Sequence, residues 1–278
     1  MKYAVSNWIY GEEPLHITAA RLAKLGYDGV ELTGEPSRYS VRETARLLAD
    51  HGLEVSSVCG IYTKERDLTN PEPRAHQAAV DYVKSCIEFA HKLRARTLIL
   101  VPTPVGKTNP SINVSEDWKR SVESVRQAAE FACQAGVVIA VEPINRYETY
   151  LVNNCEQALR YADEVGSPCV KVMLDTFHMN IEERDLAEAV RKAGKRLVHV
   201  HVADSNRQST GRGHTDFQGL VRSLDGIGYS GYLVMEPLPP VADVYSAASV
   251  LVPEATIEGY ARECIDYLKL LEGGLRGL

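Results

Sequence analysis

The sequence predicts an α/β protein of the (β/α)8 barrel class, and three observations support this prediction. Short apolar strands alternate with amphipathic helical segments along the chain of 278 residues. Eight strands, each followed by a helix, are the number that a closed barrel of this length requires. The strands are continuously apolar, as in a parallel sheet that helices cover. No linker or change in composition marks a boundary, so we expect a single domain over residues 1–278.

The expected strands are short runs of β-branched and other apolar residues. They cover residues 3–7, 29–33, 54–60, 97–101, 137–142, 170–175, 197–203 and 231–236. Amphipathic patterns predict helices between them, with clear examples at 16–26, 78–95, 118–136 and 256–273. A doubly wound open sheet is the competing fold, but it would need fewer strands or a second domain. The last residues, 271–278, are expected to form a frayed tail.

Charge and composition restrict the partners and the compartment. The formal net charge is −6 and no long basic run occurs, which argues against nucleic acid as a partner. The first ten residues read as a strand rather than a signal peptide, and no apolar run is long enough to cross a bilayer. None of the six cysteines forms a CxxC pair, so buried free thiols are the simplest interpretation. We therefore expect a cytoplasmic protein without a membrane partner.

Charged side chains end four consecutive strands. Glu142 closes the fifth strand, Asp175 the sixth and Glu236 the eighth, while His201 lies near the end of the seventh. Side chains of a barrel strand alternate between the interior and the helices. Within each strand these polar residues share the inward face, and the apolar face is left for the helices. The pattern predicts that all four residues meet at the carboxyl-terminal mouth, where barrel enzymes place their active sites.

Three carboxylates so close together would repel one another and raise each other's pKa. A bound cation relieves this repulsion. Oxygen-rich ligands with one imidazole suit Mn²⁺, with Mg²⁺ or Co²⁺ as alternatives, better than a metal that prefers thiolates. We therefore predict one divalent metal ion held by Glu142, Asp175, His201 and Glu236. A single carboxylate at a strand end is often only a helix cap or an ion-pair partner; the matched position of four residues favours the metal site.

The same segments resemble a known family. The motifs are "VEPINRYE" (141–148), "KVMLDTFHMNIEE" (171–183), "HVHVADSNR" (199–207) and "GYLVMEP" (231–237). They are similar to those of the D-tagatose 3-epimerase/D-psicose (allulose) 3-epimerase family, which belongs to the xylose isomerase-like TIM-barrel superfamily. The resemblance extends over nearly the whole chain, and the motif around "LDTFHMNIEE" is its most specific part.

The resemblance implies a metal-dependent ketose 3-epimerase, an isomerase of carbohydrate metabolism that acts on a ketohexose, ketopentose or related sugar. Glu142 and Glu236 match the two carboxylates that face opposite sides of the substrate's C3. Such a pair inverts C3 through an enediolate, because one group removes a proton while the other returns one. Glu148, His178 and Arg207 match the residues that hold the substrate's hydroxyl groups.

Other polar residues near the expected mouth have simpler explanations. His199 points inward below His201 and is expected to be a hydrogen-bonded core residue or a support for the metal ligand. Glu31, near the end of the second strand, is expected to be a structural or supporting acid. Arg207 has an alternative partner in Asp204 of the same loop.

The loops that would select the substrate match the family less well. Family members acting on free ketohexoses tend to carry aromatic residues early in the loop after the fourth strand. Here the first aromatic residue is Trp118, which we expect inside the following helix, and Lys107 lies in the loop instead. Trp8 would either cover the sugar or pack. Arg212 and His214 would either meet an anionic substrate or pair with surface acids, and we favour pairing.

Related reactions remain as alternatives. An aldose–ketose isomerase, or a related enzyme acting on a ketose derivative or cyclitol, would use a similar metal and the same two glutamates. A phosphodiesterase of the same superfamily is disfavoured, because strands two to four end without histidine. A barrel that only binds sugar is disfavoured by the complete set of metal and acid–base residues. The family implies a homodimer or homotetramer, for which segment 235–255 is a candidate interface or an internal lid.

Overall fold

Eight parallel strands close into a barrel in the order of the chain, in a computed structural model that describes residues 1–240 and 254–276. The fold class predicted from the sequence is confirmed. The strands are β1 (Lys2–Ser6), β2 (Gly29–Gly34), β3 (Glu54–Gly60), β4 (Thr97–Leu100), β5 (Val138–Val141), β6 (Val170–Asp175), β7 (Leu197–Val202) and β8 (Tyr232–Met235). β1 pairs with both β2 and β8, which closes the sheet.

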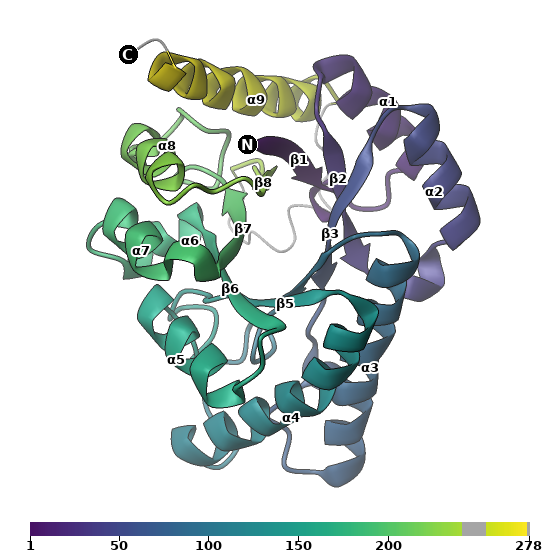
Figure 1. Cartoon of the computed structure of the whole chain (residues 1–278), viewed down its shortest axis with the longest axis vertical. Helices are drawn as coiled ribbons and strands as arrows, with labels where there is room; N and C mark the ends of the chain where they lie inside the picture. The colour runs from purple at the N-terminus through teal and green to yellow at the C-terminus, as the bar shows by residue number, and fades with distance from the viewer. Residues whose placement is uncertain (241–253, 277–278) are drawn as a thin grey trace.

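Helices cover the outside of the barrel (Figure 1). They are α1 (Leu15–Leu25), α2 (Val41–Asp50), α3 (Pro73–Lys92), α4 (Val114–Ala135), α5 (Cys155–Val165), α6 (Thr176–Glu182), α7 (Leu186–Ala193), α8 (Phe217–Gly226) and α9 (Glu254–Arg276). Short 3-10 turns are η1 (Asn7–Tyr10), η2 (Pro36–Arg38), η3 (Lys64–Arg66) and η4 (Gly194–Arg196). Local signals set many boundaries: Asn113 and Asn154 cap the starts of α4 and α5, and Gly26 ends α1 in the left-handed conformation that glycine adopts readily.

Strand residues alternate between the barrel interior and the helix-covered side, as predicted, and this alternation separates two apolar regions. Outward residues such as Leu32, Leu174 and Val200 pack into the main core beneath the helices. Inward residues form a second cluster made of Cys59, Ile99, Ala140 and Met173. Because Glu142 and Asp175 follow Ala140 and Met173 by two positions, their side chains lie on the inward side above this cluster.

Two register shifts bring polar residues of β2, β3 and β7 together. The pairing of β2 with β3 skips Ser56, so that Glu31 lies opposite Ser57. The pairing of β6 with β7 skips Val198, so that Met173 lies opposite His199. Such bulges re-aim side chains near active sites. Here they place Glu31, Ser57 and His199 within hydrogen-bonding distance of one another.

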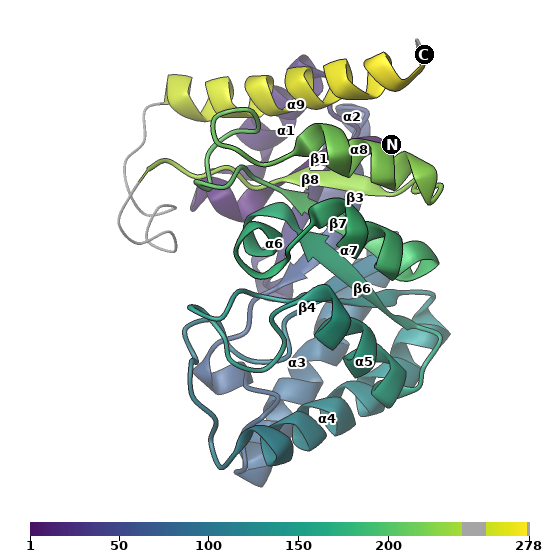
Figure 2. The ribbon, with the colours of Figure 1, turned by 90° about the vertical axis from the view of Figure 1, so that its left-hand side faces the viewer.

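The two ends of the barrel differ in what the chain places there. Figure 2 shows the strands running toward one side, where the loops after β4 and β5 lie, with the amino terminus on the other side. The two loops are joined by a backbone hydrogen bond of 2.8 Å from the Gly106 N–H to the Glu148 carbonyl. Lys107 donates to Asp67 over 2.6 Å, which ties the loop after β4 to the loop after β3. Hydrogen bonds and an ion pair therefore connect the loops that surround the carboxyl-terminal mouth.

Three sequence-based expectations need correction or fall outside the structure. The frayed tail expected over 271–278 is wrong for residues 271–276, which continue α9. The expectation of free thiols is wrong for Cys133 and Cys169, which form a disulfide with 5.5 Å between their Cα atoms. The end of α4 and the segment before β6 lie side by side and bring the two cysteines together. The other four cysteines are free and buried, as expected. Most of the proposed interface segment 235–255 lies outside the described residues.

No helix among the described residues is long and apolar enough to span a membrane.

Candidate active site

The four strand-end residues predicted from the sequence meet at the carboxyl-terminal mouth of the barrel. Asp175 ends β6 and His201 lies in β7, while Glu142 and Glu236 directly follow β5 and β8. The N–H of Glu142 donates to Leu100 over 2.9 Å, and that of Glu236 donates to Val202 over 3.0 Å. The sheet hydrogen bonds thus continue through both glutamates and hold their backbones as strand. All four side chains are buried.

His201 is the centre of this group. Its Nδ1 lies 3.2 Å from Glu236 Oε2 and 3.7 Å from Glu142 Oε1. One ligand atom each from Glu142, Asp175 and His201 lie within 4.8 Å of one another. Two oxygens and one nitrogen at this spacing fit the donor set of a divalent cation. Glu236 contacts the same imidazole nitrogen and completes the predicted set.

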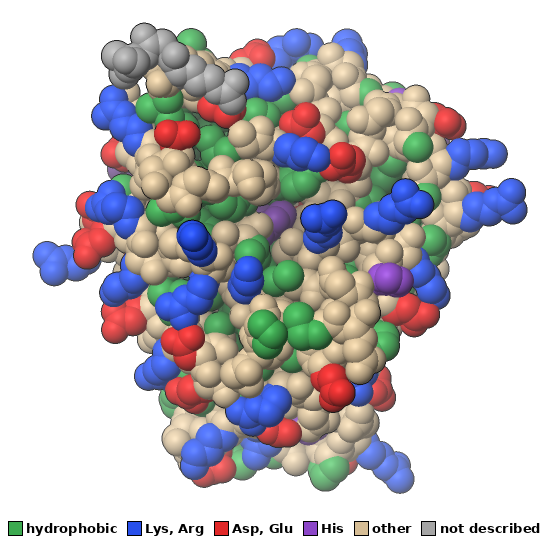
Figure 3. Space-filling model, in the orientation of Figure 1, with side chains coloured by type: hydrophobic (Ala, Val, Ile, Leu, Met, Phe, Trp, Pro, Cys, Tyr) green, Lys and Arg blue, Asp and Glu red, His purple; other side chains and the backbone are tan. Residues whose placement is uncertain are grey.

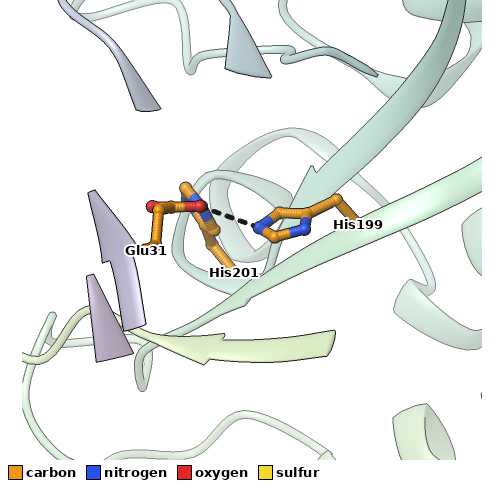
Figure 4. A group of neighbouring side chains, drawn as sticks. All are labelled: Glu31, His199 and His201. Atoms are coloured by element: carbon orange, nitrogen blue, oxygen red, sulfur yellow. Dashed lines mark hydrogen bonds and ion pairs between the residues drawn. The ribbon is translucent and has the colours of Figure 1, made fainter. Parts of the chain in front are cut away.

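Glu31 holds His201 from the other side (Figure 4). Glu31 Oε2 lies 3.1 Å from His201 Nε2 and 2.9 Å from His199 Nε2. Ser57 donates a third hydrogen bond to the same oxygen over 2.6 Å. A carboxylate next to Nε2 favours the tautomer in which Nε2 carries the proton. The lone pair of Nδ1 can then bind a metal. The expectation that Glu31 and His199 play supporting roles agrees with this geometry.

The His201 Nδ1 atom supports a metal site directly. It is buried and makes no hydrogen bond within the described residues, although Glu236 Oε2 lies 3.2 Å away. Buried nitrogens without a partner are rare, because losing hydration without a replacement is costly. A cation between this nitrogen and the carboxylates would satisfy it. The residues present therefore fit a divalent metal ion.

The electrostatics show the repulsion that the sequence analysis anticipated. Burial raises the pKa of Glu142 well above its usual value, and the carboxylates of Asp175 and Glu236 add to this rise against the opposing effect of His201. Burial also acts to raise the pKa of Asp175, but Arg207 and His178 outweigh it and lower that pKa to about 2. The group thus combines an ionised carboxylate with one that resists ionisation.

The predicted substrate-binding residues Glu148 and His178 are joined through Asn145. The Asn145 amide donates to Glu148 Oε1 over 2.9 Å and to His178 Nδ1 over 2.8 Å. Burial lowers the pKa of His178, although Asp175 opposes this effect. A neutral His178 that accepts at Nδ1 carries its proton on Nε2, which lies 3.5 Å from Asp175 Oδ2. Asn145 therefore sets the orientation of both neighbours.

Arg207 lies against the metal-ligand candidates rather than against Asp204. Its guanidinium contacts Asp175 Oδ2 at 2.8 Å and Glu236 Oε2 at 3.2 Å. The ring of Phe177 lies 4.7 Å below the guanidinium. Asp204 instead accepts backbone hydrogen bonds from its own loop, such as those from Ser205 and Gly211. The alternative ion pair of Arg207 with Asp204 is therefore absent from the structure.

The other residues that the sequence analysis singled out near the mouth are Trp118, Lys107, Arg212 and Trp8. Trp118 lies inside α4, as expected. Lys107 pairs with Asp67 at 2.6 Å, and Arg212 pairs with Glu263 at 2.7 Å. The prediction that Arg212 pairs with a surface acid is confirmed. Trp8, which the sequence predicts either to cover the sugar or to pack, donates its indole N–H to Glu236 Oε1 over 2.6 Å.

Asn145 is the main residue that the sequence analysis missed. Its only signal is its place inside "VEPINRYE", between Glu142 and Glu148. A neutral amide in a loop carries no periodicity or charge pattern, so its role emerges only from contacts with residues far along the chain.

Comparisons with known proteins agree with the fold and the site. Residues 19–255 match the xylose isomerase-like TIM-barrel family. A D-psicose 3-epimerase from Ruminiclostridium cellulolyticum is 34% identical over 224 residues, which are 78% of this chain and 76% of the relative. A 3-dehydro-D-guloside 4-epimerase from Escherichia coli is 29% identical over 244 residues, 85% of this chain and 92% of that protein. A solved D-psicose 3-epimerase with D-tagatose from Clostridium cellulolyticum H10 superposes with a TM-score of 0.89 at 30% identity, covering 98% of this chain and 99% of that structure.

The chain belongs to the xylose isomerase-like TIM-barrel family. Within that family it is a carbohydrate epimerase, and therefore an isomerase.

Proposed function

We propose that the protein is a metal-dependent ketose 3-epimerase. The observation that carries this proposal is the approach of two buried carboxylates, Glu142 from β5 and Glu236 from β8, to one imidazole nitrogen of His201, at 3.7 and 3.2 Å. This arrangement brings two proton-transfer groups from separate strands to one cation site. The similarity to relatives named D-psicose, L-ribulose and ketose 3-epimerases supports the same reaction class.

Glu142, Asp175, His201 and Glu236 would hold the metal ion. Mn²⁺ is our first choice because the set is rich in oxygen and contains one imidazole, and Mg²⁺ or Co²⁺ would also suit it. When bound, the ion supplies positive charge that makes the hydrogen next to a ketone more acidic. Glu31 would keep Nδ1 of His201 directed toward the ion.

Glu142 and Glu236 would carry the proton transfers. One carboxylate removes the proton from C3, and the electron pair of the broken C–H bond passes into an enediolate. The other glutamate, in its protonated form, delivers its proton to the opposite face of C3 and becomes a carboxylate, which inverts that centre. The reaction is reversible, so the two glutamates exchange roles with its direction. Trp8 and Arg207 donate to the Glu236 carboxylate and fix its position.

Glu148, His178 and Arg207 would bind the hydroxyl groups next to the reacting carbon. Asn145 holds Glu148 and His178 in one hydrogen-bonded unit. Arg207 contacts both Asp175 and Glu236, so it would lie beside the metal ion and beside one proton-transfer group. These residues would orient the sugar so that C3 lies between the two glutamates.

A second candidate is epimerisation next to the ketone of a larger sugar derivative. The E. coli relative named as a 3-dehydro-D-guloside 4-epimerase supports it, since it matches over 92% of its own length. Both reactions invert a carbon beside a carbonyl, so the two glutamates serve either one. An aldose–ketose isomerase that moves hydrogen between C1 and C2 is the further alternative.

Hydrogen exchange from D₂O tests these proposals. D-Psicose, D-tagatose, L-ribulose and a keto-glycoside would be incubated with the enzyme, with Mn²⁺ or with chelator, and the deuterium located by NMR. We expect metal-dependent label at C3 together with the C3 epimer. Label at C4 of the keto-glycoside alone would favour the second candidate, and label at C1 or C2 would favour the isomerase. Exchange that persists with chelator would refute the metal-dependent mechanism.

A further inference from the structure

The amino-terminal mouth of the barrel holds a large cavity that the proposed reaction does not use. Its volume is about 1250 Å³, larger than the roughly 300–1,000 Å³ of common small-molecule sites. The first residues of several strands line it, among them Glu54 of β3, Thr97 of β4 and Tyr232 of β8. The candidate active site lies at the opposite ends of these strands, so the two sites are separate.

Basic side chains dominate the wall of this cavity. Figures 1 and 3 look onto this end of the barrel, and Figure 3 shows Lys and Arg side chains around the middle of the face. The lining residues with positive charge are Lys2, Lys92, Arg94, Arg96 and Lys195. Glu54 is the one carboxylate among the described lining residues. A basic hollow stands out on a chain whose formal net charge is −6.

The nearby acids are already engaged. The Glu54 carboxylate accepts hydrogen bonds from the ammonium of Lys2 at 2.6 Å and the hydroxyl of Tyr232 at 2.5 Å. Lys92 pairs with Glu88 of its own helix at 2.7 Å. These contacts pair Lys2 and Lys92 with acids, whereas Arg96 interacts with Glu54 only at longer range. Arg94, Arg96 and Lys195 are thus left without a direct ion pair among the described residues.

Arg94, Arg96 and Lys195 form no ion pair with any residue in the ranges 1–240 and 254–276. Arg94 and Arg96 lie between α3 and β4, whereas Lys195 lies in η4 before β7, on another side of the mouth. Arg94 has a φ of 61°, and the other non-glycine residue with a positive φ in the described chain is Arg207 of the active site. This left-handed conformation ends α3, since the Ala95 N–H donates to the Ala90 carbonyl over 2.9 Å, and it directs the chain toward β4.

We propose that this cavity is a binding site for a small phosphate-bearing anion. The three unpaired cations line one concave wall, so their positive potentials add. A cleft of this kind raises the local concentration of anions. The guanidinium group of an arginine can donate two parallel hydrogen bonds to two oxygens of one phosphate. Tyr229 and Tyr232 line the same cavity and offer apolar surface to an organic group attached to the phosphate.

The cavity also has a structural link to the active site. His199 belongs to its lining, and Nε2 of His199 lies 2.9 Å from Glu31, which in turn contacts His201. The barrel interior therefore connects the two ends through a short series of hydrogen-bonded side chains.

Equilibrium dialysis of radiolabelled inorganic phosphate against the metal-loaded, full-length protein tests the site at constant ionic strength. Arg94→Gly, Arg96→Ala and Lys195→Ala are combined in one variant. The matched control combines Arg42→Ala, Arg74→Ala and Arg222→Ala, three exposed cations outside the cavity, so both variants lose the same charge. Competition by phenyl phosphate distinguishes an organic phosphate from free phosphate.

We expect saturable binding that weakens by about tenfold or more in the cavity variant, since charged hydrogen bonds are lost. The control variant should bind within about twofold of the parent protein. Tighter binding of phenyl phosphate would identify an organic phosphate as the ligand, and equal binding would identify free phosphate. Undiminished binding by the cavity variant, or equal losses in both variants, would overturn the proposal. Lys195→Ala alone serves the same test if the triple variant does not fold, with a smaller loss expected.

Discussion

The two mouths of the barrel are built on the same eight strands but handle charge in opposite ways. At the carboxyl-terminal mouth the charged groups are buried, mostly acidic, and held by neighbours such as Glu31, Trp8 and Asn145. At the amino-terminal mouth the charged groups are exposed and mostly basic, and several have no ion-pair partner among the described residues.

The buried groups of the carboxyl-terminal mouth are suited to orienting a ligand, whereas the exposed cations of the amino-terminal mouth are suited to attracting one. Buried groups must be satisfied within the protein, so their positions are set before a ligand arrives. Exposed cations remain hydrated and mobile, so they gain fixed partners only from a ligand. The comparison predicts that changes at the carboxyl-terminal mouth alter catalysis and metal binding, whereas changes at the other end alter stability or anion binding and leave turnover nearly intact.

The largest effect is expected from Glu142→Gln and Glu236→Gln. Each change removes a proton-transfer group, so kcat should fall by about a thousandfold or more, since general acid–base groups contribute about 10²–10⁴-fold. Steady-state kinetics at saturating Mn²⁺ would measure this loss, and circular dichroism would verify that the barrel folds. Glu65→Gln, at an exposed site, is the matched control. Full activity in either active-site variant would contradict the two-carboxylate mechanism.

The next effect concerns Glu31, which touches no proposed substrate group. Glu31→Gln should weaken Mn²⁺ binding by about 10–100-fold, as residues that orient metal ligands commonly do. Calorimetric titration would measure the affinity, and kcat at saturating metal should recover most of its value. Ser57→Ala, which removes one donor to Glu31 at 2.6 Å, should have a smaller effect. An unchanged affinity in Glu31→Gln would show that His201 needs no such support.

Metal binding should also weaken as the pH falls. Burial opposes a charge on His201, but Glu236 and Glu31 outweigh it and raise its pKa well above the usual value. The metal-free protein then holds a proton on His201 near neutral pH, and the metal must displace it. Affinity should increase by up to about tenfold per pH unit for each displaced proton below the raised pKa. Calorimetry in buffers of different ionisation enthalpy would detect the released protons, and a pH-independent affinity would contradict this assignment.

The smallest effect on turnover is expected from loss of the Cys133–Cys169 disulfide, which lies toward the amino-terminal mouth of the barrel. Cys133→Ser opens a link between residues 36 positions apart, which should lower the free energy of unfolding by about 2–4 kcal/mol. Thermal unfolding would measure the loss, and reduction of the parent protein should reproduce it. Turnover should stay within about twofold, because no proposed active-site residue contacts this disulfide. A large fall in kcat would mean that the two ends are coupled more tightly than the structure indicates.

Much of the fold was predictable because it repeats. Apolar strands of similar length recur between amphipathic helices, and every strand boundary expected from the sequence lies within one residue of the observed one. The inward direction of Glu142, Asp175, His201 and Glu236 was predictable for the same reason, since alternation along a strand is a local property. The disulfide was not predictable, because nothing in the spacing of Cys133 and Cys169 marks them as partners.

The sequence by itself determined which residues face the barrel interior, because side-chain alternation and hydrophobic patterning act over a few neighbouring residues. It could not determine what those residues touch. The pairing of Glu31 with His199 and His201, the bridge that Asn145 makes to His178, and the basic cavity at the far mouth all join segments distant in the chain. Such contacts depend on strand register, including two bulges, and on closure of the barrel. Only the tertiary structure decides these, because register and closure minimise the free energy of the whole sheet and not that of any one strand.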